Sequence, residues 1–211
     1  MRLVLASNNA KKLSELRALL AGFALELVPQ GALGIAEADE PHGTFIENAL
    51  AKARHAAAAS GGAALADDSG VCVDALGGAP GVISAHYGGL VEALADREAT
   101  RLKQDALNNE RLLRELAAHP APEARRAFFI STLVAVRHAA DPQPLVAVGR
   151  WPGRILPAPR GTGGFGYDPL MFVPELDRTV AELDAATKNA HSHRARAMVQ
   201  LQQQLREVWG P

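Results

Sequence analysis

Two adjacent carboxylates, Asp67 and Asp68, stand at the end of an apolar run in the segment ALADDSGVCVD, residues 64–74. The run predicts a buried strand that the two acids stop, and Ser69-Gly70 is typical of a turn. Side chains alternate between the faces of a strand, so the acids are expected to point to opposite sides and need not share a role. Carboxylate oxygens bind Mg²⁺, which neutralises charge on phosphates. With lysines nearby, the pair favours a phosphorylated ligand and is compatible with metal-assisted phosphoryl chemistry, but it does not name the reaction. An Asp-Ser-Gly turn without a catalytic role is the alternative.

A polar turn near the start of the chain offers a place for the phosphates. ASNNAKK, residues 6–12, joins a short apolar run to a leucine-periodic segment and predicts a strand, a turn and a helix. Backbone N–H groups at a helix start bind anions, whereas Lys11 and Lys12 oppose the helix dipole there. An ordinary asparagine cap with two solvated lysines explains the pattern about equally well.

A glycine-rich loop is the second candidate for ligand binding. GTGGFG, residues 161–166, matches the G-x-G-x-x-G pattern, but its flanks do not predict the strand and helix that a dinucleotide site requires. We therefore reject a Rossmann or P-loop site. The loop can still present Phe165 and Tyr167 to the ring of a ligand, or it can be a surface loop with a packed phenylalanine.

A basic segment near the C-terminus is the third candidate. In ATKNAHSHRARAM, residues 186–198, Ser192 is expected to cap a helix. Lys188, His193 and Arg194 then gather around a helix N-terminus, against its dipole, as at the first helix. Two such violations favour an anionic ligand, because proteins tend to break local rules at functional sites. A solvated basic patch is the alternative.

The elements that must position these residues alternate between strand and helix. Apolar runs predict strands at 3–6, 24–29, 125–139 and 144–151, and the last two are expected to form a hairpin around Asp141-Pro142. Periodic segments predict helices at 11–22, 45–60, 92–119 and 192–209. Thr44 and Glu47 form a capping-box pattern, and 76–82 and 152–169 are Gly/Pro-rich loops. The fold class is therefore α/β, a mixed β-sheet with flanking helices.

Length and composition exclude several classes of protein. The 211 residues, 48% hydrophobic, suffice for one substantial domain, which we expect to span 1–211. The 22 basic and 23 acidic residues nearly balance, so no global charge recruits a nucleic acid polymer or a membrane. Cys72 is the single cysteine, which suits a reducing compartment, and neither a signal peptide nor a membrane-spanning run is predicted. We expect a soluble, cytoplasmic protein.

Six segments in order carry a family resemblance over nearly the whole chain: ASNNAKK, TFIENALAKARHAA, ADDSG, LGGAPGVISAHY, GTGGFGYDP and KNAHSHRARA. Together they resemble the inosine triphosphate pyrophosphatase family, the Ham1-like proteins. The resemblance implies a two-lobed α/β fold with a central nucleotide-binding cleft, and a homodimer. It also implies Mg²⁺-dependent hydrolysis of non-canonical purine nucleoside triphosphates (ITP, dITP, XTP) to the monophosphate and pyrophosphate.

The resemblance implies roles for residues at the triphosphate end of the substrate. Glu40 and Asp68 would bind the metal, Asp68 would also be the general base, and Ser69 would touch the substrate. Asp67 is left as a supporting carboxylate. The first turn would wrap the triphosphate with Ser7, Asn8, Asn9, Ala10, Lys11 and Lys12.

The resemblance also implies residues at the base. Hypoxanthine and xanthine carry a 6-keto acceptor where adenine carries an amino donor. Lys188 and Arg194 have only donors, so these side chains would bind the keto oxygen and would leave the amino group of adenine unpaired. Phe165 would supply a stacking face. The complete implied set is Phe165, Gly166, Tyr167, Asp168, Lys188, His193 and Arg194. His86, in SAHY, departs from the arginine often found there, which puts any contact of that arginine in doubt.

Two other classes of function stay open. A Maf-like nucleotide pyrophosphatase would differ in base choice, and the KNAHSHR segment argues against it. A non-catalytic nucleotide-binding module would keep the lysines and Phe165 but would not need Asp68.

Overall fold

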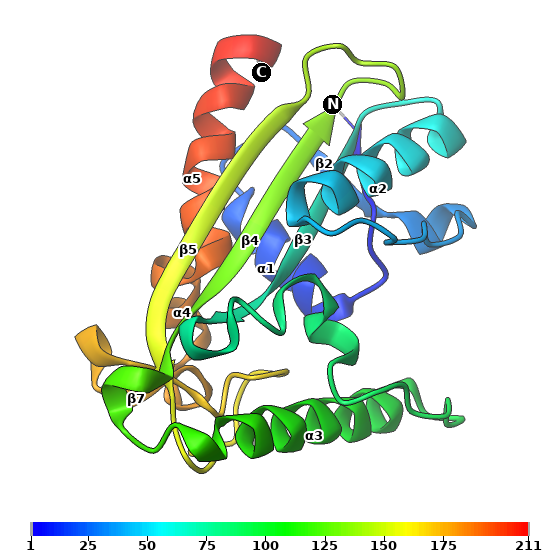
Figure 1. Ribbon diagram of the computed structural model, residues 1–211. Helices are drawn as coiled ribbons and strands as arrows, with labels where there is room; N and C mark the ends of the chain where they lie inside the picture. The colour runs from blue at the N-terminus through cyan, green and yellow to red at the C-terminus, as the bar shows by residue number, and fades with distance from the viewer. Residues whose placement is uncertain (1, 211) are drawn as a thin grey trace. The chain divides into compact units, whose positions relative to one another are not determined.

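The computed structural model describes residues 2–210. Its main elements, in chain order, are β1 (Arg2–Leu5), α1 (Ala10–Leu19), β2 (Glu26–Pro29), α2 (Phe45–Ser60), β3 (Ala64–Val73), α3 (Arg97–Glu115), β4 (Arg126–Val136), β5 (Leu145–Ile155), β6 (Met171–Val173), β7 (Arg178–Thr179), α4 (Ala185–His191) and α5 (His193–Gln204) (Figure 1). No described helix is long and apolar enough to cross a membrane.

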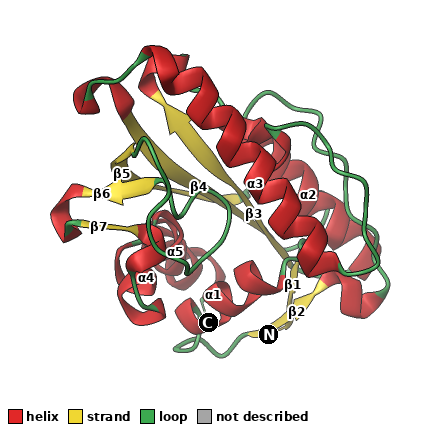
Figure 2. Ribbon diagram, turned by 90° about the horizontal axis from the view of Figure 1, so that it is seen from below, coloured by secondary structure: helices red, strands yellow, loops and turns green. Residues whose placement is uncertain are grey.

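The strands form one open, mixed sheet in the order β2-β1-β3-β4-β5-β6-β7. β1 pairs in parallel with β2 and β3, whereas β6 pairs antiparallel with β5 and β7 (Figure 2). The predicted α/β class with a mixed sheet and flanking helices is confirmed. β6 and β7 were not predicted, because strands of three and two residues show no periodicity.

The chain divides into two compact units. The first comprises the residues up to Ser69, Ser131–Arg150 and those from Asn189, and the second comprises Gly70–Ile130 and Trp151–Lys188. β3, β4 and β5 each run from one unit into the other. A single domain over 1–211 and a central cleft stay predictions.

Strand alternation builds the core of the first unit on both faces of the sheet. α1 and α5 cover one face and α2 covers the other (Figure 1). The face under α2 is lined by alanine and valine, which let that helix approach closely. The strand residues toward α1 and α5 include Leu3, Leu5, Leu65, Leu133 and Ala135, and those toward α2 include Val4, Ala6, Ala64, Ala66, Val134 and Val136.

Side-chain caps fix the helix starts in the first unit. Asn9 Oδ1 accepts hydrogen bonds from the backbone N–H of Lys11 and Lys12, at 3.0 and 3.2 Å. Ser192 Oγ accepts from the backbone of Ala195, which confirms the predicted cap of α5. Thr44 caps α2 by accepting from the backbone of Glu47 and donates its own hydroxyl proton to the Glu47 carboxylate. Each cap satisfies N–H groups that the helix leaves unpaired.

Two local predictions were wrong. β3 does not stop at Asp67 and Asp68 but continues to Val73, so Ser69-Gly70 lies in a strand. Cations pair with Asp67 and with one oxygen of Asp68 there. A Cβ on Gly70 would lie 2.6 Å from the carbonyl oxygen of Gly81. β5 likewise extends to Ile155, into the segment 152–169 predicted as a loop.

The core of the second unit forms around α3 and the ends of the long strands. Val71, Trp151 and Ile155 pack with Leu112 and Leu170 in one buried cluster. α3, however, also buries two polar side chains, Gln104 and Asn108.

Candidate active site

Asp67 is the centre of a buried ion network in the first unit. β3 directs its side chain to the face of α1 and α5, as the alternation predicted. Lys12 Nζ of α1 lies 3.0 Å from Asp67 Oδ2, and Arg194 of α5 reaches the same oxygen with Nη2 and Nε at 3.1 and 3.2 Å. Ser131 Oγ donates to Oδ1 at 2.7 Å. Glu15 pairs with the guanidinium of Arg194 as well.

These partners decide the charge of Asp67. Burial alone would raise the pKa of this carboxyl, but the cations of Arg194 and Lys12 outweigh burial and hold the pKa well below its usual range. Arg194 stays charged for the same reason, because Asp67 and Glu15 overcome the burial that would lower its pKa. The network is a permanently charged cluster that ties β3 to α1 and α5.

Asp68 points to the opposite face and meets different partners. Lys52 Nζ of α2 donates to Asp68 Oδ1 at 2.9 Å and lies 3.1 Å from Glu40 Oε1. The two acids that the resemblance assigns to a metal therefore converge on one ammonium group. Asp68 Oδ2 is buried and has no hydrogen-bond partner within residues 2–210.

The environment of Asp68 shifts its pKa in the direction opposite to that of Asp67. Burial raises the pKa of Asp68 to about 6, although Lys52 opposes the rise, and the nearby Glu40 adds to it. Burial works against the charge of Lys52, but Asp68 and Glu40 outweigh it and raise the pKa of Lys52. At neutral pH this arrangement supplies a carboxylate that can accept a proton.

The turn before α1 presents polar groups in a compact arrangement. Ser7 Oγ accepts from the backbone N–H of Asn9 at 3.2 Å, and Asn8 Oδ1 accepts from that of Gly31 at 2.9 Å. Ala10 opens α1. The Asn9 cap uses the N–H groups of Lys11 and Lys12, so Lys12 contributes its side chain to the Asp67 network while its backbone is capped.

In the second unit, the predicted base-binding residues Phe165 and Asp168 contact Lys188 of α4. Asp168 Oδ2 accepts from the backbone of Phe165 at 3.0 Å and from Lys188 Nζ at 2.8 Å. Lys188 Nζ also lies 4.5 Å from the centre of the Phe165 ring. Tyr167 is buried in the core, where its hydroxyl donates to the carbonyl of Ser84.

Arg194 and His193 begin α5 in the first unit, and both are buried. The guanidinium of Arg194 contacts Asp67, Glu15 and Ser69, whose Oγ accepts from Nη2 at 3.2 Å. The base-reading role that the resemblance implies for Arg194 stays a prediction.

The sequence reasoning missed Lys52, Glu15 and Ser131. Lys52 carried a recognisable signal, because it interrupts the alanine stripe of α2 formed by Ala49, Ala53 and Ala56. A charge on a buried helix face needs a partner there. Glu15 and Ser131 lie on an ordinary amphipathic helix and in an apolar strand, and nothing local distinguishes them.

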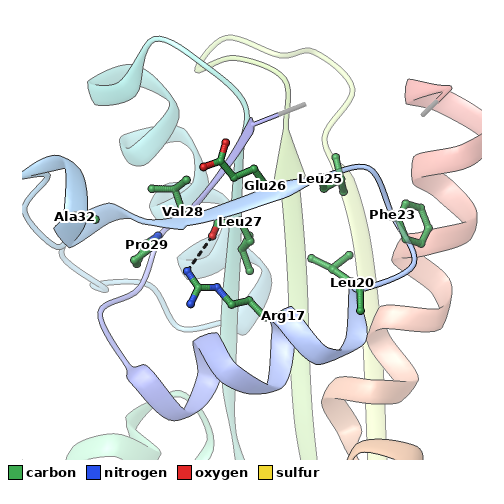
Figure 3. A pocket seen from close by; sticks show the side chains of 10 residues that line it. Arg17, Leu20, Phe23, Leu25, Glu26, Leu27, Val28, Pro29 and Ala32 are labelled. Carbon is green, nitrogen blue, oxygen red and sulfur yellow. Dashed lines mark hydrogen bonds between the residues drawn. The ribbon is translucent and has the colours of Figure 1, made fainter.

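An open hollow of about 550 Å³ lies elsewhere in the first unit, between the end of α1 and β2. Leu20, Phe23 and Leu27 form its apolar wall, and Arg17 donates to the carbonyl of Leu27 beside it (Figure 3). None of the candidate site residues lines it, so the candidate site rests on the geometry around β3. Within residues 2–210, no group of three or more His, Cys, Asp or Glu side chains is placed to hold a metal ion.

The chain belongs to the Ham1 family, whose model matches residues 3–204. The resemblance is thereby confirmed. Similar proteins are the dITP/XTP pyrophosphatases of Methylibium petroleiphilum, 64% identical over 209 residues, and of Leptothrix cholodnii, 65% identical over 212 residues, each alignment covering 99% of both chains. A solved Ham1 protein from Coxiella burnetii is 41% identical, with a TM-score of 0.86 over 99% of this chain and 100% of that one.

Proposed function

We propose that this protein hydrolyses non-canonical purine nucleoside triphosphates (dITP, XTP and ITP) to the nucleoside monophosphate and pyrophosphate. Membership of the Ham1 family and relatives named dITP/XTP pyrophosphatases support the substrate and the reaction. The observation that carries the proposal is the different surroundings of two adjacent acids of β3. Asp67 pairs with Lys12, whereas Asp68 pairs with Lys52, which also pairs with Glu40.

The first unit would bind the triphosphate. The turn from Ser7 to Lys12 and the ammonium groups of Lys12 and Lys52 offset its negative charge. Ser69 touches the substrate from β3. Asp67 holds the ammonium group of Lys12 in place and Asp68 holds that of Lys52, so little reorganisation is needed on binding.

Glu40 and Asp68 would hold Mg²⁺ together with phosphate oxygens. Their carboxylates are hard oxygen ligands that both lie next to Lys52 Nζ, and Asp68 Oδ2 is a buried oxygen without a hydrogen-bond partner among residues 2–210. When bound, the ion neutralises charge on the phosphates.

Asp68 would act as the general base. It takes a proton from a water molecule whose oxygen forms a bond to the α-phosphorus, while the bond from that phosphorus to the pyrophosphate oxygen breaks. A carboxyl with a pKa raised toward neutrality is suited to this transfer.

Base choice would depend on donor groups that match a 6-keto oxygen. Lys188, which Asp168 holds beside Phe165, offers a donor and leaves adenine's amino group unpaired. Phe165 and Tyr167, with Gly166 between them, belong to the same loop. His193 and Arg194 are proposed to assist, and in Arg194 this role competes with its contacts to Asp67 and Glu15.

A substrate panel tests the proposal. Wild type, Asp68→Asn and the control Asp74→Asn, at an exposed acid, are assayed on ITP, dITP, XTP, ATP and GTP with Mg²⁺, and pyrophosphate is measured separately from orthophosphate. Asp68→Asn should lower kcat by about a hundredfold or more. Equal cleavage of ATP and ITP would refute the base choice, nucleotide binding without turnover would indicate a binding module, and full activity of Asp68→Asn would refute its role.

We further propose that the protein is a cytoplasmic homodimer. Exposed apolar side chains on neighbouring segments of the second unit support a surface for a second copy: Ile83 (52% exposed), Leu90 (80%), Leu94 (45%) and Leu102 (60%). Light scattering of the purified protein measures the oligomeric state directly.

A further inference from the structure

The inner face of α3 is polar where a helix usually packs with apolar residues. Along α3 the first two buried residues are Gln104 and Asn108, and Leu112 follows them. Asp105 and Asn109 follow these two residues by one position each, so four polar side chains recur with helical spacing. In this polar stripe Gln104 and Asn108 are buried, and Asp105 and Asn109 are half-buried. Withdrawing polar groups from water is costly unless they form hydrogen bonds within the protein.

The stripe binds the backbone of two loops in the second unit. Asn108 Nδ2 donates to the carbonyl of Ala85 at 3.0 Å, and its Oδ1 accepts from Gly88 at 2.7 Å. Asp105 Oδ2 accepts from the N–H of Gly166 at 2.8 Å, and Asn109 Nδ2 donates to the carbonyl of Gly166 at 2.9 Å. Both polar groups of Gly166 are therefore held by residues one helical turn apart.

Gly166 is a conformationally flexible point of the loop, so its two hydrogen bonds to α3 matter for the shape of the loop. Its φ of 61° lies in the left-handed region, which glycine adopts freely, and no atom lies within 4 Å of where a Cβ would be. The two hydrogen bonds to α3 restrain this flexible position. Phe165, its neighbour, is held from the other side by Asp168.

We propose that Asp105 and Asn109 are specificity-determining positioning residues, which fix Gly166 and thereby hold the Phe165 ring and the adjoining Lys188 in the orientation that receives the purine base. The inference rests on the proposed function and deepens it. Asp105 and Asn109 act through the loop and need not touch the nucleotide.

Matched substitutions on α3 test this. Asn109→Asp removes the donor to Gly166 and places a carboxylate against its carbonyl, whereas Asn108→Asp removes the equivalent donor to Ala85 in the other loop. Asp105→Leu removes the acceptor for Gly166, and Asp105→Asn keeps one. The substitutions thus compare two loops held by the same helix.

Two readouts are expected to move together. Asn109→Asp and Asp105→Leu should raise KM for dITP about tenfold and lower the preference for dITP over dATP, in kcat/KM, by about the same factor, with kcat within about threefold. In the nucleotide-free protein, amide hydrogen exchange of residues 161–168 should become faster. Asn108→Asp and Asp105→Asn should keep wild-type discrimination.

The outcomes separate this inference from the proposed function. A wild type that hydrolyses no purine triphosphate refutes the proposed function, whereas the inference is refuted by folded Asn109→Asp and Asp105→Leu proteins with wild-type exchange and discrimination. Faster exchange with unchanged discrimination also overturns it. If Asn109→Asp does not fold, the Asp105→Leu and Asp105→Asn pair decides the question.

Discussion

Replacing Asp67 by asparagine should destabilise the protein without changing its shape. The Asp67 side chain makes five close contacts, three to the cations of Lys12 and Arg194 and two to the hydroxyl groups of Ser131 and Ser69. Removing one partner of a buried ion pair costs about 3–5 kcal/mol. Arg194 retains Glu15, and the Lys12 side chain is 18% exposed, so we expect the low end, about 3 kcal/mol.

Urea unfolding at neutral pH measures this loss. With an m-value of about 2 kcal/mol/M, the midpoint should fall by about 1.5 M. The low pKa of Asp67 stabilises the folded state above the pKa of the unfolded chain, and this contribution disappears as the pH falls. The gap between wild type and Asp67→Asn should therefore be constant near neutrality and narrow below about pH 4.

Asp68→Asn is the matched control, because it makes the same substitution one residue away. Burial raises the pKa of Asp68, so its charge opposes folding at neutral pH and its removal should cost much less stability than at Asp67. Asp68→Asn should lose activity, and Asp67→Asn should lose stability. An Asp67→Asn midpoint equal to that of wild type, or no lower than that of Asp68→Asn, would refute the reasoning.

Two further predictions concern other parts of the molecule. Asp141 is buried after β4 and accepts from the backbone of Arg137 and Gln143 and from the Arg137 guanidinium, which holds the pKa of Asp141 low. Asp141→Asn should lower the free energy of unfolding by about 1–2 kcal/mol, a modest loss because Arg137 is partly exposed. The urea midpoints of the variant and of wild type should converge below about pH 4, and activity at neutral pH should be kept. Leu102→Asp should shift light scattering from dimer to monomer, whereas Val199→Asp, at an equally exposed position on α5, should not; a dimeric Leu102→Asp would place the interface elsewhere.

The sequence predicted the long elements and the opposite directions of the two acids, because both follow from local periodicity. It failed where partners are distant along the chain. The strand through Asp67 was predicted to end there, because a buried Asp67 needs Lys12 and Arg194 as partners, and these lie on helices far away in sequence. α4, which carries Lys188, was missed because seven residues give too little pattern.

The opposite pKa shifts of Asp67 and Asp68 follow from one geometric fact. Neighbouring residues of a strand face different helices. Asp67 therefore pairs with two cations on one face of the sheet, whereas Asp68, on the other face, pairs with a lysine that it shares with Glu40. The first side fixes the charge of Asp67 and anchors Lys12, and the second leaves Asp68 able to exchange a proton. The two adjacent acids therefore have separate roles in the proposed site. Asp67 keeps the phosphate-binding Lys12 in place, and Asp68 is the base.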